Sequence, residues 1–286
     1  MGDIIWLASY PKSGNTWMRA FLHNLFHNEA RPVDVNRMQG AMLQSDGALM
    51  WFQMVDKRPV SAWSSEDVAA MRPRVCELIA RGQPGSIFCK THNALMTVHG
   101  HATINLQVTS GAIYIVRNPL DVAASSADFM GTDLDQAIAL MATDYLEMPH
   151  DPERNNVSIV SGSWSQHVAS WTGRASERLH VVRYEDMIDK PSATFGGVAR
   201  FLGLKPSRQR LLRAIRNSSF EAMRRQEERH GFKERSAHQE GFFRRGTAGG
   251  WKEELTDEQV RRICETHGEQ MKRFGYLSPG VQPAIG

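Results

Sequence analysis

The stretch YPKSGNTW at residues 10–17 has the residue types of an anion-binding loop. It follows a short apolar run, residues 4–9, and leads into an amphipathic stretch, residues 16–27, so a strand, a loop and a helix are predicted in that order. The unpaired N–H groups and positive dipole end of a helix N-terminus favour phosphate or sulfate, and Lys12 adds a full charge. Taken alone, the segment also suits an ordinary βα loop that happens to carry a lysine.

A nucleoside-triphosphatase P-loop is the main competing interpretation of this loop. Its GxxxxGK[ST] pattern would need glycines where Trp6 and Pro11 stand. The magnesium-holding aspartate of that machinery is also missing, because the apolar run at residues 112–116 ends at Arg117. No His, Cys or carboxylate grouping has metal-ligand spacing, so no metal is expected.

A second strand, turn and helix are predicted around RNPLDVAAS, residues 117–125. Arg117 can offer a two-pronged hydrogen-bond donor to a phosphate, and a proline two residues later suits the first turn of a helix. Ser125 lies about two turns into that helix. The alternative is that Arg117 pairs with Asp121 while Ser125 only packs.

Lys90-Thr91-His92 directly follow the apolar run at residues 86–89. Open α/β sheets bind ligands at the carboxyl ends of their parallel strands. The chain has 11 histidines, and most histidines serve packing or the surface. Only His92 is expected at the sheet edge that also carries Lys12 and Arg117, so it is predicted to be a general base.

The late stretch FRRGTAGGWK, residues 243–252, places two arginines and a lysine around three glycines. Glycine lets a backbone approach an anion closely. A solvated basic loop is the alternative for this segment alone. Together with the earlier segments, it supplies counter-charges for one polyanion: Lys12, Arg117, Arg244, Arg245 and Lys252.

The elements that must position these residues alternate between short β-rich runs and longer helical stretches. Strands are predicted at residues 4–9, 86–89, 112–116 and 179–183. Helices are predicted at 16–27, 119–130, 184–202 with a break near Pro191, and from the capping-box sequence TDEQ at 256–259 to about 274. This order predicts an α/β fold with a central parallel sheet flanked by helices. We expect one domain over residues 1–286, with a core at 1–277 and a flexible tail at 278–286.

Composition excludes several classes of protein. The chain has 286 residues, 41% hydrophobic and 23% charged, with a net charge of only +3, so no nucleic-acid partner is expected. No run approaches the roughly 18 apolar residues of a membrane span, so no membrane partner is expected either. Three widely spaced cysteines fit neither a disulfide framework nor a metal knuckle, and a reducing cytoplasm is the predicted location.

Three segments have no assigned element. Residues 148–157 and the charge-dense residues 224–239 are predicted to be mobile, and the second is interpreted as a lid. Residues 38–63 concentrate Met and aromatic side chains and are proposed to wall an acceptor pocket. The alternative for that third segment is an ordinary core role.

Together these residues resemble the sulfotransferase family that uses 3′-phosphoadenosine 5′-phosphosulfate (PAPS), from Ile4 to about Phe274. The resemblance implies that the 5′-phosphosulfate is bound by Lys12, Ser13, Gly14, Asn15 and Thr16, with Trp17 against the adenine. It implies that the 3′-phosphate is bound by Arg117, Ser125, Arg244, Arg245 and Gly246, and that Tyr184 and Ser218 lie on the adenine side. It also implies that His92, in the Lys-Thr-His segment, is the catalytic histidine. The Asn-Thr-Trp sequence and compact length are similar to bacterial small-molecule sulfotransferases, including those that modify glycopeptide antibiotics.

The implied reaction is in-line transfer of a sulfuryl group from PAPS to a hydroxyl or amine of a small-molecule or natural-product acceptor, leaving 3′-phosphoadenosine 5′-phosphate (PAP). His92 would take the acceptor proton, while Lys12 and Lys90 would stabilise developing charge. Two departures are Gly250, where the family's late segment usually has Asp, and the lack of the animal enzymes' short C-terminal dimer segment, so the oligomeric state is open. The alternatives are a nucleotide kinase with a degenerate phosphate loop and a non-catalytic binder of nucleotides or sulfated ligands.

Overall fold

The computed structural model describes residues 3–38, 43–150 and 155–277. Its central sheet is parallel throughout and has the strand order β2-β3-β1-β6-β9. The strands are β1 (Asp3–Ser9), β2 (Leu43–Ser45), β3 (Ser86–Thr91), β6 (Thr109–Val116) and β9 (Leu179–Arg183). Two small antiparallel pairs lie outside this sheet, β4 (Thr97–Val98) with β5 (His101–Ala102) and β7 (Glu147–Met148) with β8 (Ile159–Val160). The predicted α/β fold is therefore confirmed, although β2 was not predicted.

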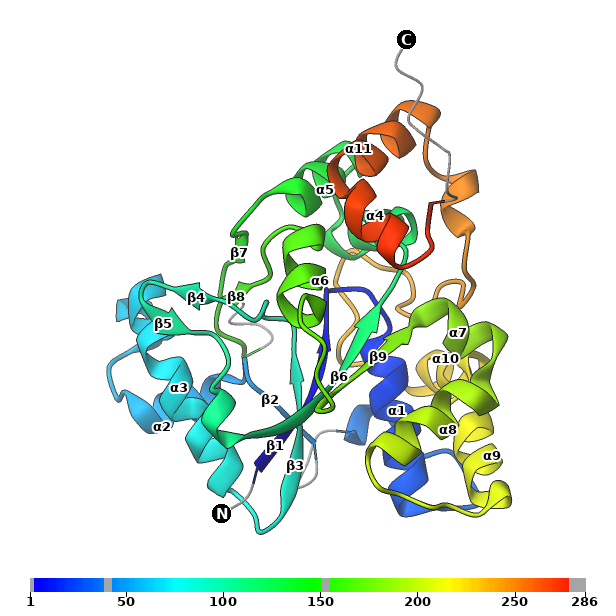
Figure 1. Cartoon of the computed structure of the whole chain (residues 1–286), viewed down its shortest axis with the longest axis horizontal. Helices are drawn as coiled ribbons and strands as arrows, with labels where there is room; N and C mark the ends of the chain where they lie inside the picture. The colour runs from blue at the N-terminus through cyan, green and yellow to red at the C-terminus, as the bar shows by residue number, and fades with distance from the viewer. Residues whose placement is uncertain (1–2, 39–42, 151–154, 278–286) are drawn as a thin grey trace.

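Helices cover both faces of the sheet (Figure 1). They are α1 (Asn15–His27), α2 (Leu49–Val55), α3 (Ser65–Arg81), α4 (Pro119–Met130), α5 (Leu134–Ala142), α6 (Trp164–Thr172), α7 (Tyr184–Asp189), α8 (Pro191–Phe201), α9 (Arg208–Asn217), α10 (Phe220–His230) and α11 (Asp257–Arg273). Short 3-10 turns lie at Val35–Arg37, Val60–Ala62, Leu106–Val108 and Gly250–Glu253.

Alternation along the strands divides the core into two layers. On β1, Trp6 and Ala8 pack into a cluster with residues of α3, α6 and α11, whereas Leu7 packs into a cluster with residues of α1, α8 and α9. This division follows from the period of two along a strand, which sends neighbouring side chains to opposite faces. Because both faces are buried, the central strands read as nearly continuous apolar runs.

Local signals account for the helix ends that the sequence predicted. Thr256 accepts a hydrogen bond from the backbone N–H of Gln259, whose side chain returns to the Thr256 N–H, so the capping box of α11 is confirmed. Pro119 begins α4 after an Asn118 cap. The predicted break near Pro191 separates α7 from α8.

The segment interpreted as a lid, residues 224–239, is not irregular throughout. Its first seven residues continue α10, which buries Ala222 and Met223 and carries an Arg224–Glu228 ion pair on its exposed face. Residues 224–230 are therefore helical and residues 231–239 lack a helix or strand, while the mobility of the segment and its role as a lid stay predictions. Residues 151–154 of the other segment, and the predicted tail 278–286, lie outside the described residues.

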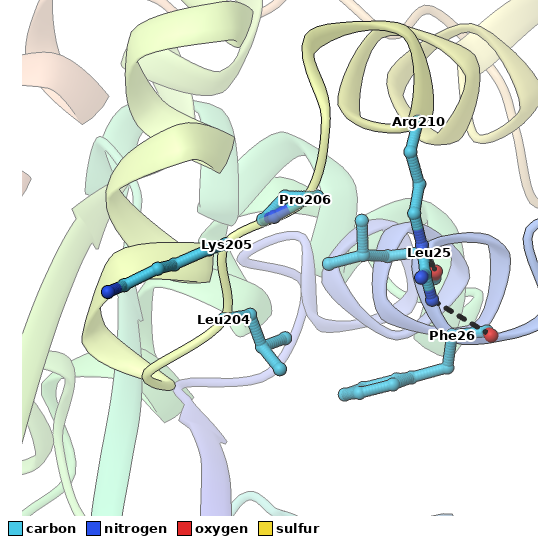
Figure 2. A pocket seen from close by; sticks show the side chains of 6 residues that line it. All are labelled: Leu25, Phe26, Leu204, Lys205, Pro206 and Arg210. Carbon is cyan, nitrogen blue, oxygen red and sulfur yellow. Dashed lines mark hydrogen bonds between the residues drawn. The ribbon is translucent and has the colours of Figure 1, made fainter.

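A shallow pocket lies where the end of α1 meets the turn between α8 and α9 (Figure 2). Its lining includes Arg210, which donates from Nε to the Leu25 carbonyl at 2.9 Å and from Nη2 to the Phe26 carbonyl at 3.2 Å. The last carbonyls of a helix lack internal partners and favour a cation. We therefore interpret this pocket as the setting of a helix cap, away from the sheet edge described next. In the described part of the chain, no helix is long and apolar enough to cross a bilayer.

Candidate active site

Three loops meet at the carboxyl ends of the central strands. In the sheet register, Ala8 of β1 lies beside Thr91 of β3, and Ser9 lies beside Ile115 of β6. The loops that follow these strands therefore start from one edge, as the sequence predicted for the segments that carry Lys12, His92 and Arg117. This edge is the candidate active site.

The loop between β1 and α1 has a backbone that few residues adopt. Lys12 has a φ of 64° and Gly14 a φ of 99°. A Cβ atom at Gly14 would lie 2.6 Å from the ring of Tyr184, so glycine is required by both conformation and space. Asn15 ties the start of α1 to the end of β1, because its Nδ2 donates to the Leu7 carbonyl at 2.8 Å and to the Ser9 hydroxyl at 3.3 Å.

Polar atoms in this loop and beside it are buried without a protein partner. Within the described residues, these atoms are Ser13 Oγ, Asn15 Oδ1, Trp17 Nε1 and Arg117 Nε. A buried polar atom without a hydrogen bond is costly, so such a group of atoms suggests a site that a polar ligand completes. The donors among them suit an anion better than a cation.

The Lys12 side chain lies between two aromatic rings. Its ammonium nitrogen is 4.1 Å from the ring centroid of Phe129, on α4, and 4.2 Å from that of Phe242, directly before the late segment. Both contacts are within the range of cation–π attraction. Lys12 therefore connects the loop after β1 with two segments that come much later in the sequence.

Arg117 supports the same loop from the neighbouring strand. Its Nη1 donates to the Lys12 carbonyl at 2.8 Å, and its guanidinium lies 4.3 Å from the Tyr184 ring centroid. The alternative that Arg117 pairs with Asp121 is wrong for the described residues. Asp121 instead accepts from the backbone N–H groups of Gly249 at 2.9 Å and Trp251 at 3.1 Å.

Tyr184 and Trp17, both expected near adenine, lie against each other edge to face with centroids 5.8 Å apart. Trp17 also packs at 5.9 Å against Phe195 of α8. Ser125 is partly buried on α4, while Ser218 is fully buried and donates its hydroxyl to the Ala214 carbonyl at 2.9 Å. Their roles toward a nucleotide stay predictions.

His92 has a defined tautomer. Its Nδ1 lies 2.8 Å from the carbonyl oxygen of Ser9, which can only accept, so Nδ1 carries the proton. Within the described residues, no protein group hydrogen-bonds to Nε2, which is left as the basic nitrogen. The carbonyl of His92 accepts in turn from His167 Nε2 at 3.2 Å, and His167 Nδ1 accepts from the Tyr114 hydroxyl at 2.8 Å. The ring and backbone of His92 are therefore both held in place.

The surroundings of His92 favour the neutral imidazole. Burial lowers its pKa well below the usual value, and the nearby Lys90 ammonium acts in the same direction. Burial also lowers the pKa of His167 to about 3. A neutral His92 with an unprotonated Nε2 has the form that a general base needs near pH 7.

A buried polar network holds the segment around His92. Asp46, which follows β2, accepts from the Thr91 hydroxyl at 2.6 Å and from the Asn93 amide at 2.8 Å. Asn93 Oδ1 accepts from the backbone N–H of Val160. Burial raises the pKa of Asp46, while the charge of Arg72 opposes that rise. Sequence analysis missed Asp46, because nothing local distinguishes it from a surface carboxylate.

Lys90 lies beside two residues that sequence analysis did not select. Its ammonium nitrogen is 3.8 Å from Oε2 of Glu234, and that carboxylate is bound by both Nη atoms of Arg19 at 2.7 Å. The one available signal was Arg19 itself, a charged residue within an otherwise apolar stretch of the first helix. Its partner is 215 positions away, so spacing gave no indication of the pair.

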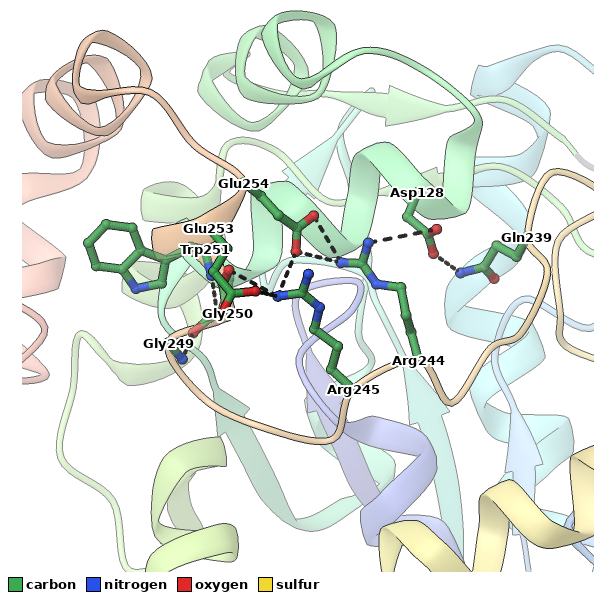
Figure 3. Close-up of polar contacts among 10 residues, drawn as sticks. Asp128, Gln239, Arg244, Arg245, Gly249, Gly250, Trp251, Glu253 and Glu254 are labelled. Atoms are coloured by element: carbon green, nitrogen blue, oxygen red, sulfur yellow. Dashed lines mark hydrogen bonds and ion pairs between the residues drawn. The ribbon is translucent and has the colours of Figure 1, made fainter.

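The late segment brings Arg244 and Arg245 next to carboxylates of this chain (Figure 3). Arg244 Nη2 lies 3.0 Å from Glu254, and its Nη1 lies 4.0 Å from Asp128. Arg245 Nη1 lies 3.0 Å from Glu253 and 3.4 Å from Glu254. The positive charge predicted for this segment is therefore partly balanced by carboxylates of α4 and of the residues that follow the segment.

Two other residues of the late segment have defined settings. Gly246 has a φ of 65°, and a Cβ there would lie 2.2 Å from the ring of Phe220. Glycine is therefore needed at this position as at Gly14. The Lys252 ammonium lies 5.9 Å from the Trp251 ring centroid.

The segment proposed to wall an acceptor pocket, residues 38–63, is split among several settings. Phe52 is fully buried in the core, and the Trp51 ring lies 3.8 Å from where a Cβ of Gly82 would be, at the end of α3 remote from the loops. Met50 and Met54 are 57% and 52% exposed. These contacts favour a core role for Trp51 and Phe52. Met42 lies outside the described residues.

Comparison with known proteins identifies the family. The model of the sulfotransferase domain matches residues 3–275. Sulfotransferase 2A1 of Rattus norvegicus is 25% identical over 288 aligned positions, which cover 98% of this chain and 87% of the rat protein. A 3-alpha-hydroxysteroid sulfotransferase of Cavia porcellus is 29% identical over 172 positions, 57% of this chain and 56% of that protein.

Solved structures share the fold. Mouse sulfotransferase SULT7A1 complexed with PAP superposes with a TM-score of 0.58 and 22% identity, covering 94% of this chain and 85% of the mouse chain. Retinol dehydratase, in a complex with androsterone and the inactive cofactor PAP, superposes with a TM-score of 0.62 and 19% identity, covering 97% and 83%.

Proposed function

This chain belongs to the sulfotransferase family, and we propose that it transfers the sulfuryl group of PAPS to a hydroxyl or amine of a small-molecule or natural-product acceptor. The observation that carries this proposal is the geometry of His92. Its Nδ1 proton is committed to the Ser9 carbonyl at 2.8 Å, which leaves Nε2 as a base beside the Lys90 side chain. A pure binding protein has no need of such an arrangement.

In the proposed reaction, His92 Nε2 accepts the proton of the acceptor hydroxyl or amine as the acceptor oxygen or nitrogen attacks the sulfuryl sulfur in line, and PAP leaves with the bridging oxygen. The Ser9 carbonyl keeps the ring in the required tautomer and orientation, in the way that a buried acceptor orients other catalytic histidines. Burial of the ring and, to a smaller extent, the charge of the Lys90 ammonium lower the pKa of His92 and so keep the imidazole neutral before reaction.

PAPS is the proposed donor, and it supplies the activated sulfuryl group when bound. The residues at the edge suit it, because Ser13 Oγ and Arg117 Nε are buried donors without a protein partner in the described part of the chain. Lys12 and Lys90 would stabilise charge on the transferred group and the leaving oxygen. The PAP named in the related structures supports the same donor.

The residues proposed to hold the nucleotide are those that the resemblance implied. They are Lys12, Ser13, Gly14, Asn15, Thr16 and Trp17 for the 5′ side and ring, Arg117, Ser125, Arg244, Arg245 and Gly246 for the 3′-phosphate, and Tyr184 and Ser218 near adenine. Arg117 supports the loop after β1 directly, so it would link recognition of the two ends of the nucleotide.

The acceptor class is proposed to be small and hydroxylated. Related proteins are named for hydroxysteroids, and androsterone is named in a related complex. A single domain, a bacterial source and a cytoplasmic location complete the proposal. The three cysteines, Cys76, Cys89 and Cys264, are all unbridged, which suits a reducing compartment.

The test is incubation with ³⁵S-labelled PAPS or γ-³²P-labelled ATP and a panel of phenols, sugars and hydroxylated peptides, followed by product analysis. We expect labelled sulfate on at least one acceptor and no phosphate transfer. Phosphorylated product would support the kinase alternative, and tight PAP binding with no product from any acceptor would support a non-catalytic binder.

A further inference from the structure

An ion pair joins the first helix to the segment after α10. Arg19 is 0% exposed, and both of its Nη atoms donate to the Glu234 carboxylate at 2.7 Å. Glu234 lies in the irregular stretch beyond α10, and its side chain is 28% exposed. The charges of Arg19 and Lys90 lower the pKa of Glu234, although burial acts in the opposite direction, so the carboxylate is ionised at neutral pH.

The arginine also reaches the first turn of α1, directly after the loop that follows β1. Its Nη2 donates to Thr16 Oγ1 at 2.9 Å. Because Oγ1 already accepts this bond, the Thr16 hydroxyl proton must point elsewhere, so the hydroxyl remains available as a donor to an anion. An arginine in this position therefore decides the direction in which Thr16 can donate.

The carboxylate reaches the other loop. Glu234 Oε2 lies 3.8 Å from the Lys90 ammonium, two residues before the proposed base. The side chains of Thr16 and Lys90 thus contact the two halves of one ion pair. This pair therefore lies between the first turn of α1 and the segment that carries Lys90 and His92.

The segment that carries Glu234 is docked by further contacts. Asn36 donates to the Gly231 carbonyl at 3.0 Å and accepts from the Lys233 backbone N–H at 2.9 Å. Phe232 is buried in a cluster with Ala20 of α1 and with Phe243. The ion pair therefore forms only when this segment, residues 231–243, lies on α1.

We propose that the Arg19–Glu234 pair is a positioning element of the transfer site, which orients the Thr16 hydroxyl and the Lys90 ammonium when residues 231–243 are docked. Neither Arg19 nor Glu234 is a catalytic residue, because each acts through a neighbour. The inference rests on the proposed sulfotransferase function. It gives the docked segment a part in completing the site.

The first test is Glu234→Gln, which keeps the shape and one hydrogen bond but removes the charge. We expect kcat for transfer from PAPS to fall about 10²-fold, the typical cost of misplacing a reacting group by about 1 Å, with acceptor KM nearly unchanged. The matched control is Glu77→Gln, which removes a surface ion pair with Arg74 on α3 and should leave kcat unchanged. A Glu234→Gln enzyme with the kcat of the wild type would overturn the inference.

The second test separates positioning from stability. Replacing both members of a buried ion pair by apolar side chains is often neutral or stabilising, whereas removing one member is costly. The double variant Arg19→Met/Glu234→Met should therefore have the same hydrogen-exchange protection of residues 231–243 as the wild type, while its kcat stays about 10²-fold below that of the wild type. Recovery of both protection and kcat would show a structural role only.

If the double methionine variant fails to fold, Glu234→Asp decides the question. It keeps the charge but shortens the reach, so we expect wild-type exchange protection of residues 231–243 with a kcat between those of the wild type and Glu234→Gln. Equal kcat values for Glu234→Asp and Glu234→Gln would overturn the positioning role.

The wild-type arm separates this inference from the proposed function. Calorimetry with PAP and product analysis with PAPS are run on the wild type first. Absence of both PAP binding and transfer would overturn the proposed function and this inference with it. Normal binding and transfer by the wild type, with kcat unchanged in Glu234→Gln, would overturn the inference alone.

Discussion

The two ends of the candidate site are held by different kinds of contact. Around His92 the holding groups are buried and include backbone, such as the Ser9 carbonyl on Nδ1 and the Asp46 carboxylate on Thr91. Around the late arginines they are side-chain carboxylates near solvent, since the Arg244 and Glu254 side chains are 37% and 20% exposed.

This difference indicates that the two ends of the candidate site are held with different strength. Buried hydrogen bonds restrict a side chain to one orientation, as a general base requires. Partly exposed ion pairs contribute only about 0–1 kcal/mol and are screened by salt, so an incoming phosphate can compete with them. We interpret the His92 end as preformed and the late end as exchangeable.

The largest expected effect is at the preformed end. His92→Ala should lower kcat by about 10²–10⁴-fold, the usual contribution of a proton-transfer group, while PAP affinity in calorimetry stays nearly unchanged. His230→Ala, an exposed histidine at the end of α10, is the control. Loss of PAP binding in His92→Ala would instead indicate a structural histidine.

The pH dependence tests the same end. The lowered pKa of His92 means that its neutral imidazole persists to a lower pH than that of an ordinary histidine. The rate should therefore hold at neutral pH and fall only below the usual histidine value of about 6.5, as measured in a kcat profile of the wild type. A fall that begins above that value would contradict this environment for the base.

Arg117→Ala tests whether Arg117 contributes to recognition of the 3′-phosphate as well as to support of the loop after β1. It should weaken PAP binding by about 1.5–3 kcal/mol, the contribution of a hydrogen bond to a charged group. Binding of adenosine 5′-phosphosulfate, which lacks the 3′-phosphate, should weaken less. Calorimetry with both ligands measures this, with the exposed Arg174→Ala as control. Equal losses would mean that Arg117 acts only by supporting the Lys12 carbonyl.

Gly14→Ala tests the shape of the loop. Both Gly14 and Gly203 have positive φ values, 99° and 70°, but a Cβ at Gly203 meets nothing within 4 Å, whereas one at Gly14 meets the Tyr184 ring. Gly14→Ala should therefore cost about 1–3 kcal/mol more than Gly203→Ala, because overpacking adds to the backbone strain that both share. Chemical denaturation of the two variants measures the difference, and equal losses would contradict the close approach.

The smallest effect is expected at the exchangeable end. Glu254→Gln removes a carboxylate that competes for Arg244 and Arg245, so PAP should bind a few-fold more tightly, in line with about 0–1 kcal/mol for a partly exposed ion pair. High salt should reduce the gain. Calorimetry measures both, with Glu258→Gln on α11 as control. Weaker PAP binding in Glu254→Gln would mean that the carboxylate orients these arginines.

Short-range information was sufficient for much of the fold. The apolar runs that became β1, β3, β6 and β9, the capping box at Thr256 and the proline at the start of α4 all act on neighbours within a few residues. Alternation of these strands with helices then implies a parallel sheet, and a parallel sheet implies one edge for Lys12, His92 and Arg117. The sequence by itself therefore determined the architecture and the sheet edge at which the candidate site lies.

Tertiary structure alone decided how the site is held. The Arg19–Glu234 pair joins residues 215 positions apart, and Asp121 binds the backbone of Gly249 rather than the nearby Arg117. The tautomer of His92 depends on the Ser9 carbonyl of a neighbouring strand. Such contacts depend on the relative placement of whole elements, which packing of both faces of the sheet determines, and no local spacing records that placement.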